Sequence, residues 1–253
     1  TVIAGRLQTA GYDWACANNA TGGAGFDVQT KLGTLNNANY LLQCGNNGRA
    51  SNAFAYVSPT FSGFSFAYNH ARVTEDRILD ATNQADLGNS YANLYAANYL
   101  NGPIDVRFVF ARIELNSQAT PGSTTEVGIN GGYDFKVVKF NASWQQSKME
   151  NFDANSKWHI QGVVPLFAAG AIIGDYGQNS IKSNATGNNS LSDNSKSFTL
   201  AYTHNLSKRT TAYAAYNRVT NSVDASLGSM SNFAMPTAGG NASVASLGVR
   251  HSF

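Results

Sequence analysis

Large apolar and polar side chains alternate along most of this chain with a period of two. In the stretch 104–110 every second residue is apolar, whereas Asp105 and Arg107 lie between them, and Leu247 and Val249 continue the same pattern near the end of the chain. Successive side chains of a β-strand point to opposite faces, so this pattern predicts strands with one apolar and one polar face. Twelve such segments can be recognised: 2–6, 52–58, 63–73, 90–100, 103–114, 124–135, 138–148, 157–166, 169–178, 195–205, 209–219 and 243–253.

The connections between these segments alternate between short and long. The short ones lie near 58–62, 101–102, 136–137, 167–168 and 206–208, and the long ones near 7–51, 74–89, 115–123, 149–156, 179–194 and 220–242. This alternation is typical of an up-and-down transmembrane barrel, which has tight turns on one rim and long loops on the other. About 10 residues at roughly 3.3 Å each, tilted near 45°, also span about 23 Å, close to the apolar band of such barrels.

Aromatic residues favour the membrane barrel over a soluble sandwich, in which the apolar series would instead form the core. Many of them lie near the ends of the apolar stripes, where membrane proteins place interfacial girdles. They are Phe64, Tyr68, Tyr133, Phe135, Phe140, Trp158, Tyr176 and Phe253. We therefore expect an all-β fold, a transmembrane antiparallel up-and-down β-barrel. Ile129 is expected to face lipid, and Asn130 to face water and to tolerate substitution by arginine.

Composition and charge narrow the function. The chain of 253 residues is 43% apolar and 13% charged, its net charge is only +2, and no basic run indicates nucleic-acid binding. No stretch approaches the roughly 18 to 20 apolar residues of a spanning helix. His70, His159, His204 and His251 lie on separate segments without metal-ligand spacing, and no serine–histidine pair stands out. An enzyme, a catalytic residue, a metal and a cofactor are therefore not expected.

Three motifs resemble the Gram-negative trimeric general porins, especially those of β-proteobacteria. The stretch 58–64 (SPTFSGF) is similar to a strand–turn–strand signature of the family, 204–210 (HNLSKRT) with Tyr213 to the turn before the penultimate strand, and 247–253 (LGVRHSF) to the terminal strand. The motifs occur in the family's order. The resemblance covers nearly all of the chain outside its long loops.

The resemblance implies one porin barrel domain over 1–253, of the 16-stranded type with about 12 strands present, and a constriction loop over about 7–51 that folds into the pore. Four N-terminal strands would then be absent, so the sequence is expected to begin inside a longer protein. The implied protein is a homotrimer in the bacterial outer membrane, among lipid and lipopolysaccharide. It would pass small hydrophilic solutes by passive diffusion, with a weak preference for anions. A substrate-specific channel of the same fold and a plugged structural or adhesive barrel remain alternatives.

Charged residues of the loop and of the polar faces are the candidates for selectivity, because charges close to a narrow pore decide which ions enter. Arg6 and Arg49 flank the long loop, and Arg49 matches a position where related porins place a pore arginine. Asp13 and Asp27 are candidates for the opposing negative charge. The polar faces of the strands add Arg107, Asp105, Glu126 and Arg250. These residues could equally be solvated, or could pair with one another.

Cys16 and Cys44 are the two cysteines of the chain. An oxidising periplasm favours a disulfide between them, and two unpaired thiols are the alternative.

Overall fold

The computed structural model describes residues 1–33, 41–44, 48–72, 90–116, 121–150, 154–167, 169–183, 191–222 and 237–252. Its strands are β1 (Val2–Gln8), β2 (Arg49–Val57), β3 (Phe64–Arg72), β4 (Tyr91–Asn101), β5 (Ile104–Asn116), β6 (Pro121–Asp134), β7 (Lys139–Met149), β8 (Asn155–Leu166), β9 (Gly170–Ser183), β10 (Leu191–Asp193), β11 (Lys196–Asn205), β12 (Thr210–Thr220) and β13 (Ala242–His251). The helices are α1 (Ala10–Cys16) and α2 (Val28–Lys31). All twelve predicted strands are confirmed, and the short β10 is additional.

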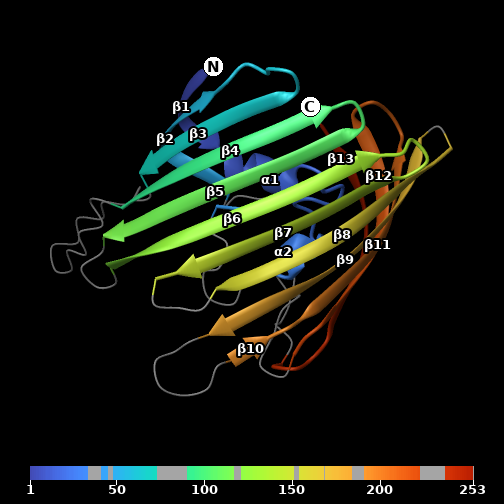
Figure 1. The fold of residues 1–253 in the computed structure, drawn as a ribbon. Helices are drawn as coiled ribbons and strands as arrows, with labels where there is room; N and C mark the ends of the chain where they lie inside the picture. Colours follow the sequence, from blue (N-terminus) through green and yellow to red (C-terminus); the bar gives the residue numbers. More distant parts are fainter. Residues whose placement is uncertain are drawn as a thin grey trace.

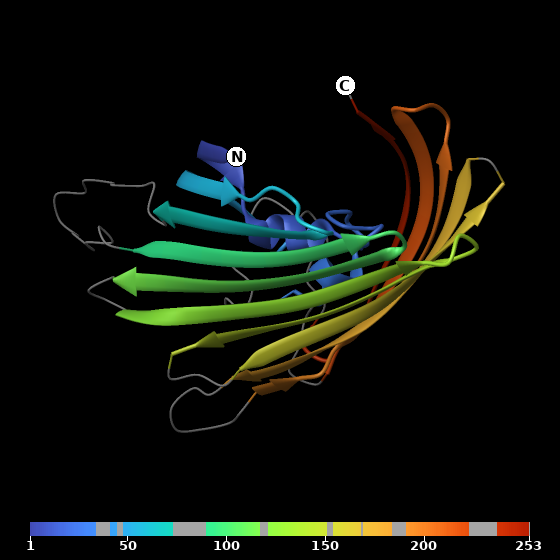
Figure 2. The same cartoon turned by 45° about the horizontal axis from the view of Figure 1, so that its top comes forward.

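The strands form one antiparallel sheet in which each strand pairs with its neighbours in the sequence. The order is β1-β2-β3-β4-β5-β6-β7-β8-β9-β11-β12-β13, and β10 pairs with β9 beside this path. The sheet curves strongly, and both helices lie on its concave side (Figures 1 and 2). Within the described ranges β1 and β13 form the two edges of the sheet. None of the described helices has the length and apolar character needed to cross a membrane.

The alternation of side chains gives the two faces of the sheet opposite characters. Phe108, Ile129 and Trp144 are direct neighbours on β5, β6 and β7, and they are 43%, 48% and 37% exposed. Next to them in the sequence, Val109 and Gln145 point to the other face and are buried. The apolar series therefore covers the convex face, which we call the outer face, as predicted; Phe253, a predicted girdle residue, lies outside the described residues. The concave face, which we call the inner wall, carries mostly small and polar residues together with a few buried aliphatic ones such as Leu94 and Val109.

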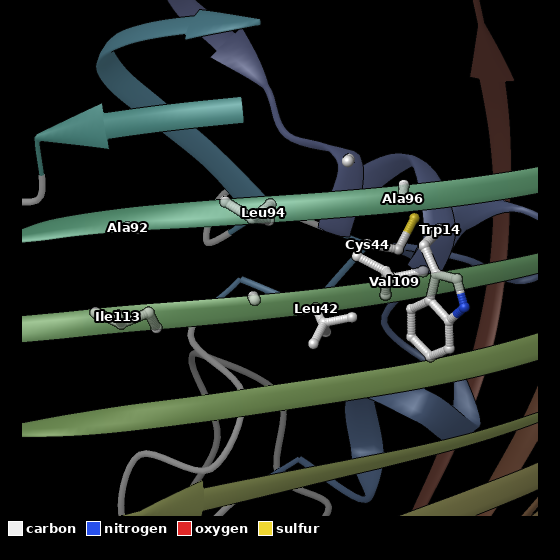
Figure 3. Packing of buried hydrophobic residues seen from close by; sticks show 11 residues of the cluster. Trp14, Leu42, Cys44, Ala92, Leu94, Ala96, Val109 and Ile113 are labelled. Atoms are coloured by element: carbon white, nitrogen blue, oxygen red, sulfur yellow. The ribbon is translucent and has the colours of Figure 1, made fainter. Parts of the chain in front are cut away.

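The inner wall is covered by the chain between β1 and β2, whose described part, residues 9–33, 41–44 and 48, we call the inward segment. Helix α1 packs on β4 and β5, and α2 packs on β8, β9 and β11. Figure 3 shows Trp14 and Leu42 of the inward segment against Leu94 and Val109 of the sheet. A Cβ atom at Gly128 would lie 2.5 Å from the Trp14 ring, so the absence of a side chain at this position leaves room for the indole.

Local hydrogen bonds start and fix the two helices. The Thr9 hydroxyl accepts a hydrogen bond from the Tyr12 amide (3.2 Å) and donates one to the Gly48 carbonyl (2.8 Å), which closes the two ends of the inward segment on each other. A disulfide joins Cys16 at the end of α1 to Cys44, as the sequence favoured. These helices span 7 and 4 residues. They are too short for an amphipathic period to show in the sequence.

Candidate functional site

The first part of the inward segment is hydrogen-bonded to the inner wall through side-chain amides. The Asn69 side chain accepts from the Ala10 amide (2.5 Å). Asn130 of β6 donates to the Trp14 carbonyl (2.6 Å) and accepts from the Asn18 side chain (3.2 Å). Because Asn69 and Asn130 are themselves buried, these contacts replace water at both the segment and the wall.

Glu126 of β6 holds the returning part of the inward segment. Its carboxylate is fully buried and accepts hydrogen bonds from the Leu42 and Leu41 amides at 3.1 and 3.2 Å. The neighbouring Gln145, which is only 2% exposed, donates to the Leu42 carbonyl (3.3 Å). Glu126 thus has the inward orientation predicted for it, but the segment covers it.

Asp27 caps α2 and is also fully buried. Its carboxylate accepts from the Gln29 and Thr30 amides at 3.2 and 3.3 Å and from the Thr30 hydroxyl at 2.7 Å. Lys157 of β8 donates to the Gln29 carbonyl (2.8 Å) and experiences the negative charges of Asp27 and Glu126. Opposite charges that share a buried region in this way offset part of each other's desolvation cost.

A third contact region lies around Gln161 of β8. Its side-chain oxygen accepts from the Ala20 amide (2.7 Å), and its nitrogen donates to Asp175 of β9 (2.8 Å). The other Asp175 oxygen lies 3.1 Å from Nδ1 of His159. The inward segment is therefore hydrogen-bonded to the wall along a line that runs from β3 to β8.

Solvent-accessible charges gather beside α1. The guanidinium of Arg107 forms two hydrogen bonds with Asp105, at 2.8 and 3.0 Å. Asp13 projects from α1 with exposed surface, yet partial burial raises the pKa of its carboxyl, and the positive charge of Arg107 opposes this shift. Arg49 lies over the ring of Tyr12, with its guanidinium carbon 5.4 Å from the ring centroid.

The structure thus divides the charged residues singled out by the sequence into three groups. Asp13, Arg107 and Asp105 lie together beside α1. Glu126, which lies beneath the inward segment, and Asp27, which belongs to that segment, are buried near Lys157. The remaining residues are exposed on strands. Arg49 contacts α1, whereas the side chains of Arg6 on β1 and Arg250 on β13 make no hydrogen bond or ion pair with any described residue.

The anchoring side chains are functional residues whose role the sequence did not indicate. They lie at inward-facing positions of the strands, and each carries a polar group that hydrogen-bonds the backbone of the inward segment: Asn69, Asn130, Gln145, Lys157 and Gln161. The alternation along the sequence indicates that these side chains face inward, but it does not indicate which group each one bonds. Among the parts of the chain that are described, no three His, Cys, Asp or Glu side chains are grouped so as to hold a metal ion.

Known porin sequences match most of this chain. A family model described as Gram-negative porin matches residues 1–224. Outer membrane porin protein 32 of Delftia acidovorans is 26% identical over 208 residues, which are 81% of this chain and 57% of that protein. An outer membrane porin protein of Bordetella pertussis is 25% identical over 206 residues, 67% of this chain and 52% of that protein. The chain therefore spans about half the length of the curated relatives it matches.

Solved structures show the same fold. The anion-selective porin from Comamonas acidovorans aligns with 100% of this chain and 74% of its own, with a TM-score of 0.77 and 21% identity. OmpF of Salmonella typhi aligns with 98% of this chain and 73% of its own, with a TM-score of 0.69 and 13% identity. At these identities the likeness concerns the architecture of the curved sheet.

Proposed function

Because this chain belongs to the Gram-negative porin family, and is accordingly an outer-membrane β-barrel protein and not an enzyme, we propose that it lines a water-filled channel for passive diffusion of small hydrophilic solutes and ions. The single observation that carries this proposal is the inward segment, which is folded and hydrogen-bonded against the inner wall. A wall that is apolar outside and polar inside supplies a hydrated path. A segment held on its inner side would narrow that path.

In this proposal residues 1–253 belong to one porin barrel domain, and the stretch from about 7 to 51 contains the constriction. Two features support the second part. The segment touches the wall from β3 to β8 through hydrogen bonds, and its disulfide and the Thr9–Gly48 contact close it into a compact unit. A unit fixed in this way would keep its charges at constant positions relative to the solute.

Weak anion preference is the selectivity that the charges favour. The carboxylates of Glu126 and Asp27 are buried and occupied by backbone amides, so they would not face a passing ion. The guanidinium of Arg49 is exposed beside α1. The similar porin from Comamonas acidovorans is described as anion-selective, which agrees with this assignment.

The partners follow from the family. We infer a homotrimer surrounded by outer-membrane lipid and lipopolysaccharide, because the solved structures of this fold include an outer-membrane protein of Vibrio cholerae in a trimer form. That structure has a TM-score of 0.63 and 12% identity to this chain. Hydrophilic solutes and small anions would be the transported species.

Planar-bilayer recording tests the proposal. Recordings of the wild-type protein should show discrete conductance steps and, in a salt gradient, a reversal potential of the sign expected for anion selectivity. A plugged barrel would show no conductance steps. Arg49→Glu should move the reversal potential toward cations. Arg72→Glu is the matched control, because Arg72 is exposed on the outer face of β3 and this substitution changes the total charge by the same amount. An unchanged potential in Arg49→Glu would remove Arg49 from the constriction.

A further inference from the structure

Two side-chain oxygens converge over Gly132 on the inner wall. Gly132 of β6 lies between Asp105 of β5 and Asn141 of β7 in the register of the sheet. A Cβ atom at Gly132 would lie 2.5 Å from Oδ1 of Asn18 and 2.7 Å from Oδ1 of Asn141, the two atoms that it would approach most closely. We call these two atoms the oxygen pair. Asn18 is 8% exposed and Asn141 is 2% exposed, so the oxygen pair lies inside the contact between the inward segment and the wall.

Both members of the oxygen pair are buried acceptors, and neither accepts a hydrogen bond from any described residue. A buried carbonyl oxygen is costly unless a hydrogen-bond donor or a cation contacts it, so two such oxygens aimed at one point indicate a ligand. A side chain at position 132 would fill the point on which they converge. Glycine at this position therefore keeps room for a ligand of the size of one atom.

The orientation of the Asn18 amide is set by its nitrogen. Nδ2 of Asn18 donates to the Asp105 carbonyl (3.3 Å) and to Oδ1 of Asn130 (3.2 Å). Asn130 is oriented in turn by its own Nδ2, which donates to the Trp14 carbonyl (2.6 Å). Turning the Asn18 amide over would place its oxygen against two other oxygens, so Oδ1 points toward Gly132.

The Asn141 amide is fixed in the same manner, through Gln161 of β8. Nδ2 of Asn141 donates to Oε1 of Gln161 (3.3 Å), and the same Oε1 accepts from the Ala20 amide (2.7 Å). Because a backbone N–H can only donate, the Ala20 amide determines which end of Gln161 is its oxygen. Gln161 then determines the orientation of Asn141, whose Oδ1 is left facing Gly132.

The charges around the oxygen pair favour a cation of low charge. The carboxylates of Asp105 and Asp175 lie on the same row of the wall, the first directly beside Gly132 and the second farther along. Arg107 forms two hydrogen bonds with Asp105, and His159 contacts Asp175, so part of this negative charge is offset. The atoms aimed at the point are neutral amide oxygens. Sites for Ca²⁺ are usually rich in carboxylates, whereas neutral carbonyl oxygens replace the hydration shell of K⁺ in channels.

We propose that the oxygen pair binds a monovalent metal cation, which joins the inward segment to the wall. The ion contacts Oδ1 of Asn18 from the segment and Oδ1 of Asn141 from β7. Water completes its coordination on the side of Asp105, whose side chain is 21% exposed. The ion supplies the positive charge that both buried oxygens lack among the described residues. The proposal concerns the attachment of the segment and does not require channel activity.

Urea unfolding of the full chain in lipid vesicles tests the site, with choline chloride progressively replaced by KCl at one ionic strength. The unfolding midpoint of the wild type should rise with K⁺ and saturate. Gly132→Ala places a methyl group where the oxygens converge and should raise the K⁺ concentration at half-saturation by about tenfold or more, the equivalent of about 1.4 kcal/mol. Gly131→Ala is the matched control on β6 and should keep the wild-type response, because its new Cβ would have only Val106 as a neighbour, at 3.9 Å.

Hydrogen exchange locates the effect. Exchange of the peptide that contains Asn18 and Ala20 should be slower in K⁺ than in choline for the wild type and Gly131→Ala, and equal in the two salts for Gly132→Ala. If Gly132→Ala does not fold, Asn141→Ala takes its place, because it removes one of the two oxygens without filling the point.

Crystals of the wild type grown with thallium(I), a heavy substitute for K⁺, identify the ligand. An anomalous peak in contact with both oxygens supports the proposal, whereas an ordered water without anomalous signal at that point would overturn it. The absence of a K⁺ response in the wild type, or an equal response in Gly132→Ala, would also overturn it. So would a response to Ca²⁺ but not to K⁺ that is lost in Gly132→Ala, because the site would then be divalent.

Discussion

Substitution of Ile129 by arginine tests the assignment of the outer face to lipid. Ile129 lies on β6, is 48% exposed and has Phe108 and Trp144 as direct neighbours on the adjacent strands. None of these three side chains is covered by another part of the described chain. An arginine at this position would have to place its guanidinium in hydrocarbon or bend along the wall toward a rim.

The position of Ile129 in the strand gives the magnitude. It precedes Asp134, the last residue of β6, by five residues. At roughly 3.3 Å per residue and a tilt near 45°, Ile129 lies about 12 Å from that rim, which is the middle of an apolar band about 25 Å tall. Arginine at the midplane of such barrels costs roughly 2–4 kcal/mol. Tyr133 lies one residue from the end of the strand, where the expected cost falls to about 0–1 kcal/mol.

The measurement is the free energy of unfolding in guanidinium, followed by tryptophan fluorescence for protein folded into lipid vesicles. Ile129→Leu serves as the conservative control at the same depth. Ile129→Arg should lose several times more stability than Tyr133→Arg. Equal losses at the two positions, or no loss at Ile129, would refute both the mid-membrane depth of Ile129 and its orientation toward lipid.

Three further predictions concern the inward segment. Replacing Cys16 and Cys44 by serine should lower the free energy of unfolding by roughly 3–4 kcal/mol in the loop-entropy account for their separation of 28 residues, and wild type with a reductant should match the variant in denaturant titrations. Burial raises the pKa of Asp13, so its carboxylate loses charge beside Arg107 at a higher pH than a free aspartate would; anion preference should therefore increase as the pH falls through this raised pKa, and reversal potentials of Asp13→Asn should lack that increase. Glu126→Gln replaces a charged acceptor of two backbone amides and should weaken the attachment by about 1.5–3 kcal/mol; hydrogen exchange of the peptide containing Leu42 should rise in this variant but not in Glu150→Gln, whose side chain is exposed.

The strands could be predicted because their cause is local. Alternation of large apolar and polar residues, as around Phe108 and Trp144, determines both the extended conformation and the face that each side chain takes. Helix α1 has no comparable local signal in its seven residues. It is stabilised by the Thr9 cap and by packing of Trp14 against an alanine-rich part of β4 and β5, and such contacts between distant segments cannot be read from a short stretch of sequence.

The candidate site was predictable only in part, for the same reason. The alternation of side chains along β6 correctly assigned Glu126 and Asn130 to the inner side of the barrel. Asn130 was expected to face water and to accept an arginine, but that expectation is wrong, because Asn130 is 3% exposed and bonds the Trp14 carbonyl and the Asn18 side chain. The inside of a barrel contains both water and folded chain. The alternation identifies which side chains face inward, but it does not indicate whether water or folded chain lies against them.

This distinction changes how the charge of the inner side should be counted. Taken from the sequence, its acidic and basic residues nearly balance, and no ion preference results. The structure buries the carboxylates of Glu126, Asp27 and Asp175 and the amines of Lys157 and Lys31. Burial therefore removes more negative than positive charge from the surface that a solute would meet, since His159, the remaining buried base, adds charge only when protonated. The inward segment thus has two roles in the proposed channel: it narrows the path, and by covering these carboxylates it shifts the exposed charge toward the sign that attracts anions.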